Sequence, residues 1–277
     1  METNFEKKSS KAERTYAVIG DPIAHSRSPE IYAPMFKRFG INADFLKLHV
    51  TAAELCRIRT IASEHSLNGF AVTMPHKRTI LPLLDGVDET AAACGSVNIV
   101  TIENNGKTFF GHNTDGDGLV NALKEAGAEI RGANAVILGH GGAASGAATA
   151  LRRAGAAVRF IVRSKKDGID ILSAIKLAES ESGVLSAADI LVNATPIGMQ
   201  SSDGVVSDYA ETLFLRFLKP DAVVADMVYR AGGTRLVRDA LHLGLTAFGG
   251  ERMLLHQGIL AFKLWTGLDY SPNECAF

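Results

Sequence analysis

Two serine side chains lie two residues apart near the start of a predicted helix. Ser26 and Ser28 precede Pro29 and Glu30, a proline and an acid of the kind that open helices. Hydroxyl groups, backbone donors and the positive end of the helix dipole can together bind a carboxylate at such a place. Ser28 at the N-cap is equally typical of a helix that binds nothing, so both interpretations stay open.

A lysine and an aspartate follow two other predicted elements. Thr73 and Lys77 come directly after a short apolar segment that Pro75 stops, and Asp115 lies where another helix begins. An amine and a carboxylate that share one substrate hydroxyl can move a proton to or from that oxygen. Alone, Lys77 would be a surface lysine and Asp115 a helix cap. The sequence leaves open which of the two is formally the base.

Gln257 interrupts an apolar stripe on the last predicted helix. Met253, Leu260 and Leu264 share its side of the helix, at intervals of three and four residues. A polar side chain within such a stripe needs a hydrogen-bonding partner. We therefore expect Gln257 to reach another polar group.

A glycine-rich turn links an apolar strand to an apolar helix that we predict over 147–153. Gly139, Gly141, Gly142, Ala143 and Ala144 follow the segment AVIL, in a GxGxxA arrangement. The first glycine permits a tight turn, the second lets the backbone approach a pyrophosphate, and the alanine keeps the helix close to the sheet. The pattern predicts dinucleotide binding, although a tight strand–helix turn also favours glycine.

The strand after this turn ends in a basic loop. An acid at this point usually accepts the ribose hydroxyls of NAD, whereas this chain has Arg163, Ser164, Lys165 and Lys166. Cations and a hydroxyl suit the 2′-phosphate of NADP. The sequence favours NADP over NAD, and the alternative is a solvated basic loop.

Two groups of elements must position these residues. In the first group we predict strands, helices and one hairpin with an Asn-Gly turn, at 15–20, 28–39, 44–50, 52–65, 69–73, 98–103 and 107–112. In the second group, a helix over 115–127 precedes short apolar strands that alternate with helical stretches, at 135–138, 158–162, 190–193, 223–226 and 245–248. This alternation predicts a parallel sheet covered by helices.

We therefore predict an α/β protein of two domains. The first domain spans 1–110, and the dinucleotide-binding Rossmann domain spans 111–249. The last helix, over about 252–265, has no strand after it, so we expect 250–277 to pack back on the first domain.

Composition narrows the class of protein further. The 277 residues are 47% apolar and 21% charged, which excludes a disordered or collagen-like chain. The net charge of −1 argues against a nucleic-acid partner recognised through a broad basic surface. Three dispersed cysteines give neither a zinc motif nor a disulfide framework, and no metal site is expected. Without a signal-like or membrane-spanning segment, we expect a cytoplasmic protein that is a monomer or a homodimer.

Seven motifs together resemble one known family. GDPIAHSRSP, VTMPHK, GSVN, GHNTDG, GHGGAA, NATPIGM and MLLHQG are similar, in order and spacing, to the shikimate dehydrogenase family, over about residues 15–270. The resemblance implies that 1–110 is an N-terminal α/β substrate-binding domain, that 111–249 is a Rossmann NADP domain, and that the active site lies in the cleft between them. It also implies the interconversion of 3-dehydroshikimate and shikimate in aromatic amino-acid biosynthesis.

The same resemblance implies a role for each matching residue. Lys77 and Asp115 match the catalytic pair, and Ser26 and Ser28 the residues that hold the substrate carboxylate. Residues expected to bind substrate hydroxyls or line the pocket are Thr73, Asn98 and Gln257. Residues expected to contact the cofactor are Gly139, Gly141, Gly142, Ala143, Arg163, Ser164, Lys166, Thr195 and Met253.

Some positions depart from the family pattern. Ala71 stands where many members have asparagine, and Asp167 stands where a second arginine is common. His140 and Arg252 replace smaller residues near the expected cofactor site. These departures leave open a quinate/shikimate dehydrogenase that prefers NAD or quinate. A non-catalytic sensor of a dinucleotide and an acid is the other alternative.

Overall fold

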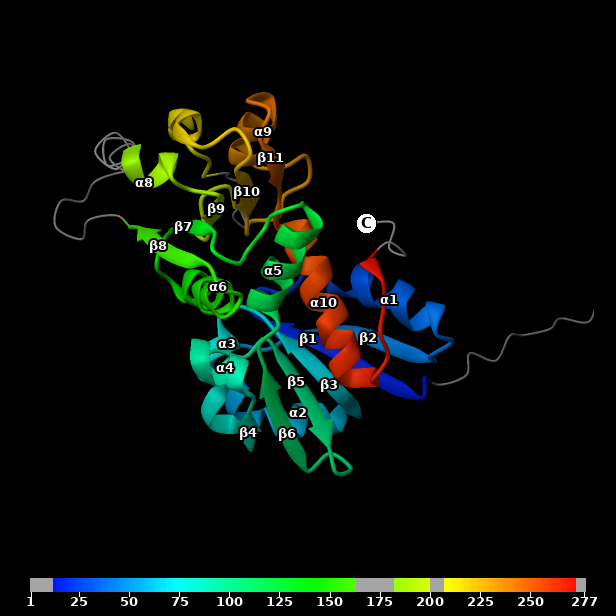
Figure 1. The fold of residues 1–277 in the computed structure, drawn as a ribbon. Helices are drawn as coiled ribbons and strands as arrows, with labels where there is room; N and C mark the ends of the chain where they lie inside the picture. Colours follow the sequence, from blue (N-terminus) through cyan, green and yellow to red (C-terminus); the bar gives the residue numbers. More distant parts are fainter. Residues whose placement is uncertain (1–11, 163–181, 200–206, 273–277) are drawn as a thin grey trace, which may run out of the picture.

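The chain forms two β-sheets that follow one another along the sequence. The computed structural model describes residues 12–162, 182–199 and 207–272. All strands of the first sheet lie within residues 14–112, and all strands of the second within 134–248. Figure 1 shows the first sheet below and the second above, with the C-terminal helix beside both. The described fold therefore confirms the α/β class.

The first sheet has six strands in the order β2-β1-β3-β5-β6-β4. β1 pairs in parallel with β2 and β3, β5 and β6 form an antiparallel hairpin, and β4 pairs in parallel with β6. The strands are β1 (Arg14–Gly20), β2 (Ala43–His49), β3 (Leu67–Val72), β4 (Gly86–Val87), β5 (Ile99–Glu103) and β6 (Thr108–His112). The predicted hairpin is confirmed, and its turn carries three consecutive residues with positive φ at Asn104, Asn105 and Gly106.

Helices cover both faces of the first sheet because its strands are apolar on both sides. One face packs against α2 (Ile58–Glu64), α4 (Glu89–Cys94) and Ile80, which directly follows α3 (His76–Thr79). The other face packs against α1 (Ser28–Arg38) and the C-terminal helix α10 (Gly250–Thr266). Short 3-10 turns, η1 (Leu55–Arg57) and η2 (Leu81–Leu83), complete this part of the chain.

The second sheet is parallel throughout the described strands, in the order β11-β10-β9-β7-β8. Its strands are β7 (Asn134–Leu138), β8 (Ala157–Ile161), β9 (Ile190–Asn193), β10 (Val223–Asp226) and β11 (Thr246–Phe248). All five lie within two residues of the predicted positions. The parallel sheet that the alternating pattern predicts is confirmed.

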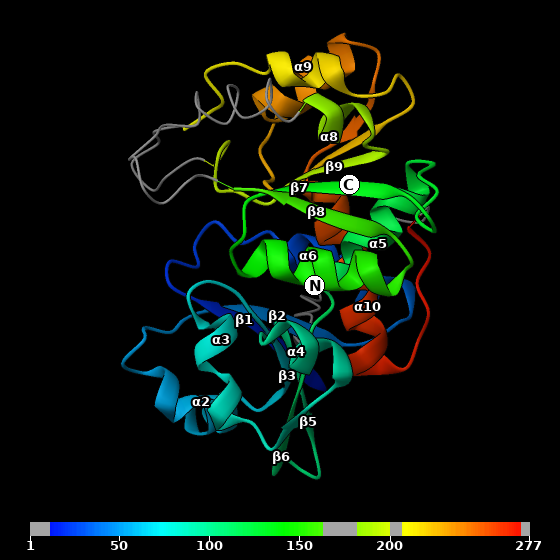
Figure 2. The same cartoon turned by 60° about the vertical axis from the view of Figure 1, so that its left-hand side comes forward.

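Helices also lie on both faces of the second sheet, as Figure 2 shows. One face packs against α5 (Asp115–Glu125) and α6 (Gly142–Arg153), and the other against α8 (Ser182–Ser186), α9 (Arg235–His242) and the 3-10 turn η3 (Leu213–Phe217). α6 starts at the second residue of the glycine pair, five residues before the predicted helix at 147. The turn is therefore shorter than the sequence indicated, and Ala144 is fully buried against the sheet.

The C-terminal helix α10 belongs to the cores of both sheets. Near its start, Met253 joins the core beneath the second sheet, whereas Leu255, Ala261 and Phe262 join the core of the first. Near its end, the Trp265 indole donates to the Val100 carbonyl at 3.1 Å and stacks on the ring of Tyr16. One helix thereby connects the two sheets.

Two local predictions about the first helices are wrong. The helix expected over 52–65 starts later than predicted, because a turn over 52–54 precedes η1 and α2; in that turn the Glu54 carboxylate accepts the Thr51 hydroxyl and backbone N–H. The N-cap of α1 is Arg27 and not Ser28, which is the first helical residue and makes no capping bond. Ser28 is thus not needed to cap its helix.

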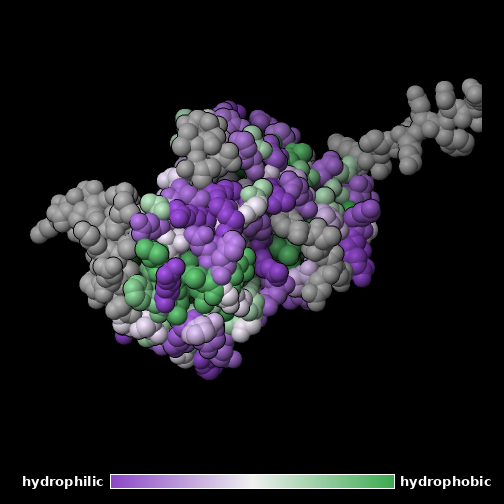
Figure 3. All heavy atoms as spheres, turned by 90° about the horizontal axis from the view of Figure 1, so that it is seen from above, coloured by the Kyte–Doolittle hydropathy of each residue, from purple (hydrophilic) through white to green (hydrophobic). Residues whose placement is uncertain are grey.

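Hydrophobic side chains reach the surface unevenly. Seen from above, green residues gather beside the grey atoms, and purple residues dominate the rest of the coloured surface (Figure 3). The large apolar side chains most exposed among the described residues include Met74, Leu213 and Leu241. Within the same described ranges, no helix combines the length and the apolar character needed to cross a membrane.

Candidate active site

Lys77 and Asp115 form an ion pair between the two parts of the chain. Lys77 Nζ lies 2.5 Å from Asp115 Oδ2, although 38 residues separate them in sequence. The side chains are 33% and 22% exposed, so a small molecule can reach both groups while bulk water is partly excluded. The structure brings together the two residues expected to exchange a proton with the substrate.

Asn98 is the centre of the hydrogen-bond network around this pair. Its Nδ2 lies 2.9 Å from Asp115 Oδ1 and 3.2 Å from Gln257 Oε1, and its Oδ1 accepts the Thr114 backbone N–H at 2.8 Å. Gln257 is buried, and its Nε2 donates to the Leu254 carbonyl at 2.9 Å. The partner expected for Gln257 is therefore Asn98.

Strand ends and a buried histidine fix the positions of these groups. Lys77 lies on α3 just after β3, and the preceding residue, His76, is fully buried with Nε2 2.5 Å from the Val50 carbonyl. The Lys77 carbonyl accepts the Val97 N–H at 2.7 Å, one residue before Asn98. Asp115 is the first residue of α5, directly after β6, and Thr114 is its N-cap. Lys77 and Asp115 thus each lie at or near the start of a helix that follows a strand of the first sheet.

The segment after β1 that carries Ser26 and Ser28, which we call the serine segment, lies next to the end of β3. Ser26 Oγ and Ser28 Oγ are 3.2 Å apart, which matches the predicted hydroxyl pair. A Cβ on Gly20 would come 2.5 Å from Thr73 Cγ2, so glycine is required where the serine segment leaves β1. Thr73 therefore lies beside Gly20, the residue after which the serine segment begins. It shows no direct contact from either serine to Lys77.

Tyr229 is a residue of this region that the sequence analysis missed. Its hydroxyl donates to the His25 carbonyl at 3.2 Å and so connects the loop after β10 to the serine segment. Burial raises the pKa of Tyr229 above its ordinary value and keeps the hydroxyl protonated as a donor. An aromatic residue three positions beyond a buried strand end was the available signal.

The glycine-rich turn is open where a diphosphate would approach. Gly139 has a φ of +100°, a conformation that strongly favours glycine, and Gly141 is the N-cap of α6. A Cβ on Gly141 would meet nothing within 4 Å, and Gly141, Gly142 and Ala143 are all exposed. These residues fit a dinucleotide diphosphate, because backbone donors at a free helix N-terminus face open space.

Thr195 lies beside this turn, as predicted for a cofactor-binding residue. A Cβ on Gly139 would lie 3.1 Å from Thr195 Cγ2. The Thr195 hydroxyl donates to Asn193 Oδ1 at 2.7 Å and accepts the Ile197 N–H at 3.2 Å. Met253 packs in the core beneath the second sheet, and its place near the nicotinamide stays a prediction. Arg163, Ser164 and Lys166 lie outside the described residues.

Ala71 and Arg252, which depart from the family pattern, lie in different parts of the fold. Ala71 is buried in the core between the first sheet and α10. The Arg252 guanidinium donates to Glu125 on α5 at 2.7 Å, and His256 Nε2 lies 3.1 Å from the same carboxylate. Burial acts against the charge of Glu125, but these hydrogen bonds hold its pKa below the usual range. Arg252 is thus engaged at the junction of α5 and α10.

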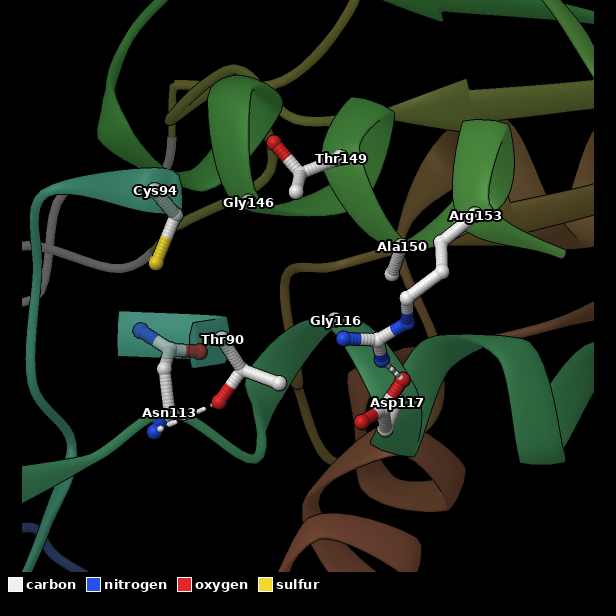
Figure 4. Close-up of a pocket in the computed structure, with 9 residues that line it drawn as sticks. All are labelled: Thr90, Cys94, Asn113, Gly116, Asp117, Gly146, Thr149, Ala150 and Arg153. Carbon is white, nitrogen blue, oxygen red and sulfur yellow. Dashed lines mark hydrogen bonds and ion pairs between the residues drawn. The ribbon is translucent and has the colours of Figure 1, made fainter. Parts of the chain in front are cut away.

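A separate small pocket lies where α4, α5 and α6 meet (Figure 4). It is lined by Thr90, Cys94, Asn113, Gly116, Asp117, Gly146, Thr149, Ala150 and Arg153. Gly116 allows the close approach of α5 and α6, because a Cβ there would lie 2.7 Å from that of Ala150. None of the residues predicted for substrate or cofactor lines this pocket, so it is not the candidate active site.

Known proteins resemble both ends of the chain and its overall fold. The Shikimate dehydrogenase substrate binding domain matches residues 18–100, and the Shikimate 5'-dehydrogenase C-terminal domain matches residues 250–269. A shikimate dehydrogenase (NADP(+)) from Staphylococcus haemolyticus is 37% identical over 263 residues, which cover 93% of this chain and 94% of the relative. The chain belongs to the shikimate dehydrogenase family.

Two further relatives of this family agree with that assignment. A shikimate dehydrogenase (NADP(+)) from Rubrobacter xylanophilus is 40% identical over 268 residues, covering 91% of this chain and 90% of the relative. The solved shikimate 5-dehydrogenase from Thermus thermophilus, in complex with NADP(H) and shikimate, has a TM-score of 0.77 and 32% identity, covering 94% of this chain and 96% of that one. The resemblance inferred from seven motifs is confirmed.

Proposed function

We propose that this protein is an NADP-dependent shikimate dehydrogenase, which reversibly reduces 3-dehydroshikimate to shikimate in aromatic amino-acid biosynthesis. The observation that carries the proposal is the Lys77–Asp115 ion pair, whose aspartate accepts a hydrogen bond from Asn98, itself bonded to Gln257. Relatives that cover nearly the whole chain bear this activity in their names. A pure sensor of the two ligands would not need a proton-exchanging pair.

Bound NADP(H) supplies or accepts the hydride, and the side chains of this protein manage the proton. Lys77 and Asp115 share the substrate oxygen that gains or loses the proton, so the charge that develops there meets groups already in place. The Asn98 amide donates to Asp115 Oδ1, which leaves Asp115 Oδ2 to Lys77 and the substrate. This division of the two carboxylate oxygens keeps the pair oriented before the substrate binds.

The substrate carboxylate and hydroxyls have separate proposed contacts. Ser26 and Ser28 present two hydroxyls at the start of α1, where the helix dipole also favours an anion. Thr73, Asn98 and Gln257 line the side that faces the ring hydroxyls. The paired serines support shikimate over quinate as the preferred acid.

The cofactor has proposed contacts on the second sheet. Gly139, Gly141, Gly142 and Ala143 would hold the diphosphate, and Thr195 and Met253 would lie on the nicotinamide side. Arg163, Ser164 and Lys166 would bind the 2′-phosphate that distinguishes NADP from NAD. These residues fall within a domain that we define as 111–249, with 1–110 and 250–277 forming the substrate-binding domain; Met253, at the start of α10, is the exception.

Steady-state rates test this proposal most directly. Initial rates with shikimate and quinate, each against NADP and NAD, give four values of kcat/KM. We expect the highest value for shikimate with NADP. A higher value for quinate with NAD would replace the proposal by a quinate/shikimate dehydrogenase. Binding of both ligands without turnover at any pH would replace it by a sensor.

The setting of the enzyme is a further part of the proposal. We place it in the cytoplasm, with small-molecule ligands and with neither nucleic acid nor membrane as partner. The balance of 29 basic and 30 acidic residues argues against a nucleic-acid partner, because anionic ligands would be bound at local sites and not by a charged surface. Light scattering on the purified protein distinguishes the monomer from the homodimer.

A further inference from the structure

Arg78 lies on α3, beside the first sheet, and its side chain reaches the glycine-rich turn between β7 and α6 of the second sheet. It follows Lys77 in α3, and its side chain is exposed. A Cβ placed on Gly142 would lie 3.6 Å from both Nε and Nη2 of Arg78. Across the described ranges, this guanidinium makes no hydrogen bond or ion pair. The Arg78 guanidinium of α3 thus lies beside the glycine-rich turn that precedes α6.

The electrostatic setting of Arg78 is unfavourable without an anion. Gly142 is the first residue of α6, whose N-terminus carries a positive partial charge. α6 has no acidic residue in its first turn, and its N-cap Gly141 offers no side chain. The guanidinium and the helix end therefore present like charges to one another. An anion bound between them would convert this repulsion into attraction on both sides.

We infer that Arg78 is a cofactor-binding residue that contacts the diphosphate of the dinucleotide. The inference rests on the proposed function, which supplies the dinucleotide. A planar guanidinium suits phosphate oxygens because it can donate two parallel hydrogen bonds. The diphosphate would then lie between the backbone donors of Gly141 and Gly142 and the side chain of Arg78.

The short helix that carries Arg78 gives this contact a second consequence. α3 is anchored by the buried His76, and it carries Lys77 as well as Arg78. The same rigid turn thus holds the proton-exchanging lysine at the substrate and an arginine at the cofactor. Binding of the dinucleotide therefore stabilises the apposition of the two sheets that the Lys77–Asp115 pair requires.

Direct binding measurements on Arg78→Ala and Arg78→Lys test the inference. Calorimetric titration of the full-length protein gives Kd values for NADPH, NADH and adenosine 2′-phosphate, which lacks the diphosphate. We expect Arg78→Ala to raise Kd about tenfold for NADPH and NADH alike and to leave adenosine 2′-phosphate unchanged. Arg78→Lys, which keeps the charge but not the fork, should have a smaller effect on the same two ligands.

The matched control is Arg57→Ala. Arg57 is an exposed arginine of η1 that pairs with Glu64 at 3.8 Å, and the variant should bind all three ligands like the wild type. Unchanged NADPH and NADH affinities in Arg78→Ala would overturn the inference. So would a loss confined to NADPH, or an equal loss for adenosine 2′-phosphate, because either places Arg78 away from the diphosphate. Failure of the proposed function is distinct: the wild type itself would not bind NADPH or oxidise shikimate.

Discussion

Two aspartates, one at the start of α5 just after the first sheet and one at the end of β10 in the second sheet, are each hydrogen-bonded to an asparagine, yet the two carboxylates are built for different work. Asp115 is partly exposed, and it pairs with the Lys77 ammonium group as well as with Asn98. Asp226 is 1% exposed, and its partners are the neutral groups of Asn193, Thr234 and the Val228 backbone, at 2.6–2.9 Å. Burial raises the pKa of Asp226 to about 6, an effect that these hydrogen bonds only partly offset.

The contrast between Asp115 and Asp226 distinguishes an aspartate suited to proton exchange from one suited to stabilising the fold. An aspartate that meets both a cation and solvent can exchange a proton with a bound hydroxyl. An aspartate enclosed by neutral donors instead orders the chain around it. Asn193, the partner of Asp226, also accepts hydrogen bonds from the Thr195 and Tyr209 hydroxyls. The second network therefore holds the loop beside the glycine-rich turn.

The largest effect is expected from removing the cation of the first network. Lys77→Ala should lower kcat by about 10²–10⁴-fold, because the substrate oxygen loses a proton-exchanging partner. The Kd of NADPH should stay nearly unchanged, since the glycine-rich turn remains intact. Steady-state kinetics and NADPH titration measure the two quantities. Lys124→Ala, which removes an exposed lysine of α5, is the control. An equal loss of cofactor affinity in Lys77→Ala would contradict the assigned role.

The buried aspartate should reveal itself in the pH dependence of stability. Because its pKa is about 6 in the folded protein and lower when unfolded, Asp226 holds a proton that the unfolded chain releases. Its contribution to the free energy of unfolding is therefore present below about pH 4 and is lost as pH rises to about 6, by up to about 3 kcal/mol.

Urea unfolding at pH values from 4 to 7 checks this on the wild type and on Asp226→Asn. The variant keeps an acceptor for Asn193 and Val228 but cannot titrate, so its stability should fall less across this interval. Carboxylates with lowered pKa, such as Asp189 and Asp239, titrate at lower pH and cancel in the comparison. Identical pH profiles for the two proteins would show that Asp226 is ionised throughout.

Much of this architecture could be predicted from local sequence pattern. The apolar runs before Gly139 and around residue 192 are buried strands because no polar side chain interrupts them, and the motifs identified Lys77 and Asp115. The link from Asn98 to Gln257 spans 159 residues, and no local pattern encodes such a contact. The same holds for Tyr229 and Arg78, which reach the other sheet's residues only after the chain folds. The missed start of α6 has a local cause, since its N-cap Gly141 and its first residue Gly142 are of a type that disfavours helices.

The backbone of the glycine-rich turn offers a second comparison, between two glycines that lie two residues apart. Gly139→Ala should cost about 2 kcal/mol of stability, since a φ of +100° is strained for alanine and its methyl group would meet Thr195. Gly141→Ala should unfold like the wild type, because its φ is −72° and nothing lies within 4 Å. Its added methyl group should instead raise the Kd of NADPH. Thermal unfolding and NADPH titration on both variants distinguish these effects, and a reversed pattern would contradict the proposed diphosphate position.

A change in substrate binding with only a small change in stability is expected at the serine segment. Ser28→Ala should raise the KM for shikimate about tenfold, because one of two hydroxyls that would hold the carboxylate is lost. Since Ser28 does not cap α1, the free energy of unfolding should fall by only about 1 kcal/mol, the contribution of its hydrogen bond to Ser26. Ser63→Ala, an exposed serine of α2, is the control for both quantities. If Ser28→Ala lost stability while KM stayed the same, the serine pair would serve the fold and the carboxylate would bind elsewhere.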